Sequence, residues 1–279
     1  MGAIRLAYAD FVRGFKNSKM LVIILLCIFF FYNQILSMRA LAEQFGIGIT
    51  IYVYPMFMTL SRGRMYALIL VAMMMGEAPY YNGAEVFISM RINRFKWFVG
   101  KLIYILMLSA TFQVVMMVVS VAVCAPYIGI SNDWGDIIRT YISAMQGGVS
   151  VTGTVDSAYF LSLNPAICMV KEFILMVLMS VIIALLIFLI NGVFKNIMGT
   201  ILVGIVVLID GYLNDLSWCG IWGVKYIMPT TWVDINSFAL CEGLSFEKCI
   251  LYMMLMIVVL VVAGFIFVGK KIIRPVKNV

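Results

Sequence analysis

The stretch from Cys249 to Val268 constrains the fold of this chain most, because its twenty residues carry no charge before Lys270 and Lys271. About 20 apolar residues in a helix cross the hydrocarbon core of a bilayer. Within lipid the backbone must satisfy its own hydrogen bonds, and a single segment does so only as a helix. The whole chain is 64% hydrophobic and 12% charged, whereas a soluble domain carries roughly 25% charged residues. The sequence therefore predicts an all-α integral membrane protein.

Six apolar segments of this kind predict six transmembrane helices. Their approximate limits are 20–36, 57–76, 102–125, 166–190, 197–212 and 249–268. The second segment is the hardest to bound, because Met65 to Met75 alone is too short to span a bilayer. We expect this segment to extend back toward Phe57, with Arg62 and Arg64 reaching the outer headgroups.

Residues 3–19 predict an amphipathic helix ahead of the first span. Its apolar and basic side chains separate onto opposite faces. The apolar face carries Ile4, Tyr8, Phe11 and Phe15, and the basic face carries Arg5, Arg13 and Lys16. Such a helix lies on the cytoplasmic leaflet of a membrane. A signal-peptide n-region is less consistent with the sequence, because the basic segment is long and no A-x-A-like site follows the apolar run.

The distribution of charge predicts the orientation of the chain. The amino terminus, 76–101, the turn at Asn191 and the tail together hold 13 of the 20 lysines and arginines, and the opposite side holds 7. Since loops rich in Lys and Arg stay in the cytoplasm, both termini are expected there, in a multi-pass cell-membrane protein with a single domain over 1–279. This asymmetry accounts for the net charge of +7, so nucleic acid is not an expected partner.

The loops on the opposite side are larger. Residues 125–165 predict a short helix near 134–145. Residues 211–248 are apolar yet interrupted by Gly and Pro, which favours a hairpin that dips into the outer leaflet under the cover of other protein segments. Cys219 and Cys241 share this second loop, and a disulfide between them is compatible with the sequence.

The sequence shows none of the common catalytic and cofactor-binding motifs. It contains no histidine, which excludes histidine bases, histidine metal ligands and histidine-containing triads. It contains neither G-x-x-x-x-G-K-[ST] nor H-E-x-x-H, and its six cysteines show no C-x-x-C spacing. We therefore expect no catalytic residue, cofactor or metal ion, and the chain is not expected to be an enzyme.

Asp210 is a charged residue within the fifth apolar segment, and it has two interpretations. A buried acid in a membrane marks an ion or substrate path. An acid near the end of a span can instead reach the outer interface, here beside Tyr212, and the sequence favours this second interpretation. Gly199, Thr200 and Gly204 make the same helix a candidate for close helix packing.

The longest charged connection between two apolar segments is 76–101. Asn82, followed three residues later by Glu85, predicts a capped short helix that begins near Gly83. This helix would present one apolar face, formed by Val86, Phe87 and Met90. A capped helix on the basic side of a membrane can serve as a docking lever for a cytosolic protein. The alternative is an ordinary cytoplasmic loop.

A basic and aromatic turn follows the predicted helix. It contains Arg91, Arg94, Phe95, Lys96 and Trp97, and Lys101 follows in the same stretch. This composition is typical of the cytoplasmic end of a membrane helix. We expect Trp97 to lie among the headgroups and the basic side chains to face the cytosol.

One local pattern comprises Gly76-Glu77-Ala78-Pro79, Arg91, Arg94, Lys96-Trp97 and Gly100-Lys101. In this pattern and in its overall layout, the chain resembles the permease subunits of ATP-binding-cassette exporters of the ABC type-2 family, particularly small Gram-positive members without a fused ATPase. The resemblance implies that 83–91 is a coupling helix contacting a separate cytosolic ATP-binding subunit. It also implies that substrate passes outward between two permease protomers, identical or different, in a bacterial plasma membrane. Arg62 and Arg64 depart from the family's pattern.

Two functions from different classes are compatible with the sequence. The first is a transport subunit that exports a peptide, lipid or drug-like substrate when a separate ATPase drives it. The second is a non-transport membrane protein, such as an immunity or sensor factor that binds a partner in the bilayer. An ion-coupled carrier is less consistent, because Asp210 is the only plausible coupling charge and the sequence shows no internal repeat.

Overall fold

The computed structural model describes residues 2–76, 78, 93–147, 157–194, 197–215, 228–240 and 243–271, and the described part of the chain is helical without a β-strand. Four helices are long and apolar enough to cross a membrane, which indicates a membrane-embedded protein. They are α2 (Ser18–Phe45), α6 (Arg94–Val123), α9 (Pro165–Phe194) and α13 (Phe246–Lys271). These helices match the first, third, fourth and sixth predicted spans and are longer than them.

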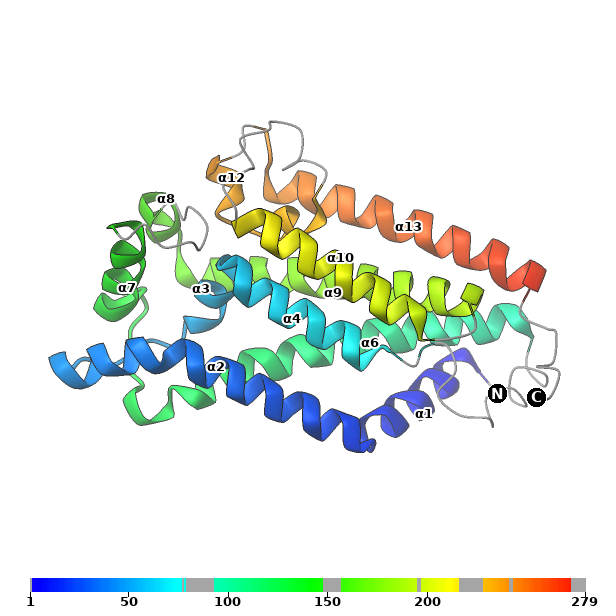
Figure 1. The fold of residues 1–279 in the computed structure, drawn as a ribbon, viewed down its shortest axis with the longest axis horizontal. Coiled ribbons are helices and arrows are strands. Elements are labelled where there is room, and N and C mark those ends of the chain that lie inside the picture. Colours follow the sequence, from blue (N-terminus) through cyan, green and yellow to red (C-terminus); the bar gives the residue numbers. More distant parts are fainter. Residues whose placement is uncertain are drawn as a thin grey trace.

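The helices form an elongated bundle with two distinct ends (Figure 1). We call one the terminal end, because α1 (Ala3–Phe15) and the carboxyl end of α13 lie there. The opposite, distal end carries the shorter elements. These are α7 (Gly135–Gly147), α8 (Ser157–Ser162) and α12 (Ser237–Leu240), with the 3-10 turns η1 (Ala125–Tyr127) and η3 (Pro229–Trp232) in the connections. Helix α7 confirms the predicted short helix near 134–145.

The second predicted span, 57–76, is not one continuous helix. It is replaced by α3 (Val53–Thr59) and α4 (Ser61–Met74), which are bent by 96° at Leu60. A close approach fixes this break, because a Cβ atom at Gly63 would overlap with the carbonyl oxygen of Phe57. The lack of a side chain at Gly63 therefore allows the chain to turn sharply where the sequence predicts a straight helix.

Arg64 does not reach the headgroups as expected, because its side chain is only 2% exposed. The break leaves the carbonyls of Met58 and Thr59 without helical donors. The guanidinium Nη1 of Arg64 donates to both carbonyl oxygens, at 3.1 and 3.0 Å. Arg62 alone of the two arginines is exposed. The prediction was wrong for Arg64 because the sequence alone does not show which backbone carbonyls the break leaves without a backbone donor.

Helix α10 (Met198–Asp215) corresponds to the fifth predicted span, 197–212. Its apolar part, Met198–Leu213, is shorter than the four long helices. It lies beside α4 and α9. A Cβ atom at Gly211 would lie 2.9 Å from the side chain of Met65, so α10 and α4 approach closely at their distal ends. Six spans remain a prediction, since four long helices and one bent pair meet the criteria of length and composition.

The amino-terminal helix forms as predicted, but its buried face differs from the predicted apolar face. Leu6, Ala7 and Asp10 are buried, and the helix packs against α6. Ile4 and Tyr8, from the predicted apolar face, are 72% and 63% exposed. Helix α1 therefore has one face against the bundle and a second apolar face directed outward. Contact of that outer face with a membrane remains a prediction.

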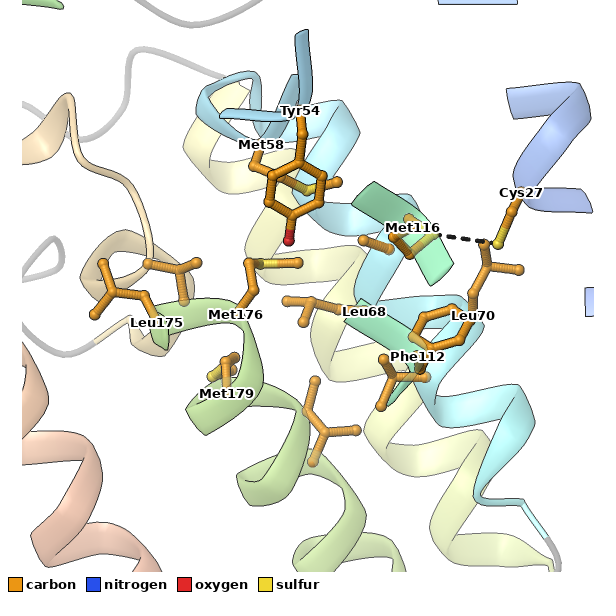
Figure 2. Close-up of a cluster of buried hydrophobic side chains, with 14 of the residues drawn as sticks. Cys27, Tyr54, Met58, Leu68, Leu70, Phe112, Met116, Leu175, Met176 and Met179 are labelled. Atoms are coloured by element: carbon orange, nitrogen blue, oxygen red, sulfur yellow. Dashed lines mark hydrogen bonds between the residues drawn. The ribbon is translucent and has the colours of Figure 1, made fainter. Parts of the chain in front are cut away.

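The interior between α2, α3, α4, α6 and α9 is rich in methionine (Figure 2). The Cys27 thiol lies 3.2 Å from the sulfur of Met116. The Tyr54 hydroxyl donates at 3.0 Å to the side-chain oxygen of Gln113, whose amide donates at 2.8 Å to the hydroxyl of Ser180. This hydrogen-bonded chain ties α3, α6 and α9 together within an otherwise apolar core.

Candidate functional site

Asn191, near the end of α9, joins the end of α4 to the start of α10. Its side chain is 3% exposed. The amide Nδ2 donates to the carbonyl oxygen of Gly76 at 3.1 Å and to that of Ala78 at 2.7 Å. The amide Oδ1 accepts from the backbone N–H of Gly199 at 2.7 Å. One buried side chain therefore fixes the beginning of the connection between α4 and α6 to the start of α10. We call this arrangement the Asn191 clamp.

Two further residues complete the Asn191 clamp. The hydroxyl of Thr200 donates to the carbonyl oxygen of Gly76 at 3.1 Å. A Cβ atom at Gly199 would lie only 2.6 Å from Asn191 Oδ1, so the amide fits because position 199 has no side chain. The predicted close packing is confirmed at Gly199. At Gly204 a Cβ atom would meet no described residue within 4 Å, so the described part of the chain shows no close packing there.

The other end of this connection is attached to the bundle through Lys101. Its ammonium Nζ lies 3.0 Å from Oδ2 of Asp10 in α1, and the two side chains are 2% and 3% exposed. The same Nζ lies 5.7 Å from the ring centroid of Trp97. The Trp97 ring packs against Phe188 of α9, with ring centroids 6.0 Å apart. The first two turns of α6 therefore contact both α1 and α9.

These contacts correct two expectations for the basic aromatic turn. Trp97 is 2% exposed and lies inside the bundle rather than among headgroups, and Lys101 is buried rather than facing the cytosol. The physical reason is that both belong to α6, which begins at Arg94 and turns them toward α1 and α9. Arg94 and Lys96 are exposed, as expected.

The start of α6 is also attached to α13. The side chain of Asn93 accepts from the backbone N–H of Phe95 at 3.1 Å, which caps the helix. The Phe95 ring stacks on Phe265 with centroids 5.0 Å apart, and Phe98 meets Phe265 edge-on at 4.6 Å. Among the predicted coupling residues the structure describes only Arg94. The others, Asn82, Glu85, Val86, Phe87, Met90 and Arg91, lie outside the described residues.

Asp210 is buried at the distal end rather than exposed at an interface, with an exposed fraction of 7%. Its Oδ2 accepts from the backbone N–H of Thr230 at 3.3 Å. Its Oδ1 has no hydrogen-bond partner among the described residues. The side chain therefore does not extend to the surface as expected, because Thr230 of η3 packs against this end of α10. A role in a substrate path remains untested.

Sequence reasoning did not predict the ion pair that lies near Asp210. Arg64 Nη1 and Asp234 Oδ2 are 3.0 Å apart. Burial raises the pKa of the Asp234 carboxyl, and the guanidinium of Arg64 opposes that rise. The only signal for this pair was an arginine in a segment expected to span the bilayer, where a charge requires a partner.

Metal binding finds no support within the described residues, which contain no group of three or more His, Cys, Asp or Glu placed to hold an ion. The four described cysteines are buried and form no disulfide with one another; they are Cys27, Cys124, Cys168 and Cys249. Cys219 and Cys241, the proposed disulfide pair, lie outside the described residues. No protein-family model, curated protein or solved structure that was compared with this chain matches it.

Proposed function

We propose that this chain is the transmembrane permease subunit of an exporter of the ABC type-2 kind. A separate cytosolic ATP-binding subunit would drive it, and a second permease protomer would complete the transport path. In this proposal the terminal end faces the cytoplasm of a bacterial cell. The chain itself hydrolyses no ATP, and its task is to convert motion of the ATPase into motion of membrane helices.

The observation that supports this proposal most is the attachment at both ends of 79–92, the segment that includes the predicted coupling helix. At its start the Asn191 clamp binds Gly76 and Ala78 to α9 and α10. After its end, Phe95 contacts α13 and Lys101 contacts α1. A displacement of this segment would therefore reach four helices, through the buried contacts of Asn191 and Lys101 and through the ring stack of the exposed Phe95. Close-packed helices respond to such displacement by moving as units.

The alternative, a non-transport protein that binds a partner within the bilayer, does not require this linkage. It predicts that changes to the Asn191 clamp affect stability alone. If the chain is an exporter subunit, binding of the ATPase and its coupling to the membrane helices should be separable. The segment 79–92 would bind the ATPase, and the Asn191 clamp would transmit its motion.

The experiment is co-purification of the chain with stand-alone ATP-binding subunits expressed from the same genome, followed by measurement of ATP hydrolysis in lipid nanodiscs. Phe87→Ala should weaken binding of the subunit that co-purifies. Asn191→Ala should keep binding but reduce the stimulation of hydrolysis by the permease roughly 2- to 30-fold, corresponding to about 0.5–2 kcal/mol of coupling. Asn33→Ala is the matched control, because Asn33 is exposed and, among the described residues, its side chain bonds the Phe29 carbonyl of its own helix.

Two outcomes would contradict the proposal. The first is that the wild-type chain binds no ATP-binding subunit. The second is that Phe87→Ala and Glu85→Ala both keep full binding and coupled hydrolysis. Either result would favour the non-transport alternative.

A further inference from the structure

Three buried ionisable side chains and one partly exposed one, from four different elements, lie near one another at the distal end of the bundle. Arg64 comes from α4, Glu172 from α9, Asp210 from α10 and Asp234 from the turn after η3. The three residues on helices are at most 7% exposed, and the Asp234 side chain is 13% exposed. These four residues therefore comprise one basic side chain and three acidic ones. We call these residues the distal charge cluster.

Two of the three acids in the cluster accept hydrogen bonds. Asp234 pairs with Arg64 at 3.0 Å and also accepts from the backbone N–H of Asn236 at 3.0 Å. Asp210 accepts from the backbone N–H of Thr230. These donors stabilise a negative charge on both aspartates.

Glu172 differs from both aspartates. Its side chain has no exposed surface, and neither carboxyl oxygen has a hydrogen-bond partner among the described residues. Burial of an ionised carboxylate without donors is costly, and such a group becomes neutral instead. A proton removes this cost and needs no cavity, unlike a larger cation.

Neither described cation near Glu172 forms an ion pair or hydrogen bond with it in this conformation. The titratable groups that interact electrostatically with Glu172 or with its charged neighbours are Arg64 from α4, Asp234 after η3, Tyr54 from α3, Asp210 from α10, and Cys168 and Lys171 from α9 itself. Arg64 attracts a negative charge on Glu172, but its Nη1 is already 3.0 Å from Asp234. The Lys171 ammonium lies over the ring of Phe246, 5.2 Å from its centroid. Both nearby cations therefore have other partners in this conformation.

We propose that Glu172 is a proton-binding site and that it carries a proton in this conformation. When the proton leaves, the guanidinium of Arg64 moves from Asp234 to Glu172. In this step the O–H bond of Glu172 breaks and the proton passes to water at the distal end. The new carboxylate then receives the guanidinium of Arg64. Asp234 keeps its charge and becomes hydrated, which its partial exposure and its bond from Asn236 allow.

The position of Arg64 gives this exchange a structural consequence. Arg64 holds the open carbonyls of Met58 and Thr59 at the break between α3 and α4. Movement of its guanidinium toward α9 would alter those bonds and hence the bend of 96°. Helix α4 leads directly from this break to Gly76 in the Asn191 clamp. The proposal does not depend on an ATPase and would also hold for a non-transport protein.

The experiment is infrared spectroscopy of the purified chain in lipid nanodiscs at neutral pH. A protonated carboxyl group has a C=O stretching band that an ionised carboxylate lacks. Wild type should show this band, and Glu172→Gln should lose it. Asp136→Asn should keep it, because Asp136 is an exposed acid of α7 at the same end. Asp234→Asn should weaken the band, because it frees Arg64 to pair with an ionised Glu172.

A second measurement avoids dependence on the folding of variants. Wild-type protein made with glutamate labelled with ¹³C at the side-chain carboxyl should show the band shifted, which separates Glu172 from both aspartates. The proposal would be overturned by an absent band, by a band that the label does not shift, or by a folded Glu172→Gln that keeps it. An unchanged band in Asp234→Asn would overturn the partner exchange. None of these results bears on ATPase binding, so the proposed function is tested separately.

Discussion

Lys101 of α6 and Asp10 of α1 form an ion pair with 3.0 Å between Nζ and Oδ2, and both side chains are almost completely buried. The pair is the polar centre of the contact between α1 and the bundle. Removal of one partner leaves the other charge buried and uncompensated, which costs more than the pair itself contributes. The amino-terminal helix is therefore held by an interior contact as well as by any attraction to the membrane.

Asp10→Ala should destabilise the packing of α1 by about 3–5 kcal/mol, the usual cost of a broken buried ion pair. The double variant Asp10→Leu with Lys101→Met should recover most of this loss, because no buried charge remains. Protease sensitivity of α1 in detergent measures the effect. Asp133→Ala serves as control, since its 4.0 Å pair with Arg139 is exposed and worth about 0–1 kcal/mol. Equal sensitivity of the single and double variants would contradict the role of charge.

Gly199→Ala and Gly204→Ala should have opposite effects, although both glycines lie in α10. A methyl group at 199 would lie 2.6 Å from Asn191 Oδ1, and overpacking of this kind costs about 1–3 kcal/mol. A methyl group at 204 meets nothing within 4 Å, so better helix propensity should stabilise α10 by up to about 1 kcal/mol. Thermal unfolding of the two variants side by side checks this. Similar shifts in both would argue that the Asn191 clamp is loosely packed.

Substitutions in α1 should separate folding from contact with the membrane. Ile4→Asp changes an outward side chain, so the protein should fold normally but α1 should bind anionic vesicles less strongly as an isolated peptide. Leu6→Asp places a charge on the face that packs against α6, and the full-length protein should lose stability. Unaltered vesicle binding of the Ile4→Asp peptide would show that the outer face of α1 does not lie on the membrane.

Accessibility of single cysteines in a cysteine-free background should report the orientation in cells. Cysteines at Ser131 and Ser245, which are exposed and lie just before α7 and α13, should react with a membrane-impermeant reagent added outside. Cysteines at Ser89 and Asn278 should react only after the membrane is opened. Labelling of the Ser89 position from outside would reverse the orientation that the charge distribution predicts.

The sequence was sufficient for the helical class and for the approximate position of the long helices, because uncharged runs such as Cys249 to Val268 have no other stable form in lipid. Helix ends were predicted less well. Helix α2 continues through the polar residues Asn33 and Gln34 to Phe45, because its hydrogen bonds do not stop where the apolar run stops. The length of an apolar run reflects the thickness of the bilayer core, whereas the helix itself can continue into the polar residues that follow.

The site contacts were beyond prediction from the sequence for a different reason. Asn191 was visible only as part of a turn, and its partners Gly76 and Ala78 lie more than a hundred positions earlier. Arg64 was assigned to the headgroups because its partner Asp234 belongs to a distant loop. Both contacts depend on which helices become neighbours, and local periodicity does not contain that information.

The separation of Asp10 from Lys101 along the chain, 91 positions, has a consequence for biogenesis. Synthesis runs from the amino terminus, so α1 leaves the ribosome well before α6 is made. During that interval Asp10 has no counter-charge from Lys101, and α1 cannot take its final place. Docking of α1 is therefore a late step that follows synthesis of α6, and burial of Asp10 against Lys101 requires that the first two long helices, α2 and α6, have both been made.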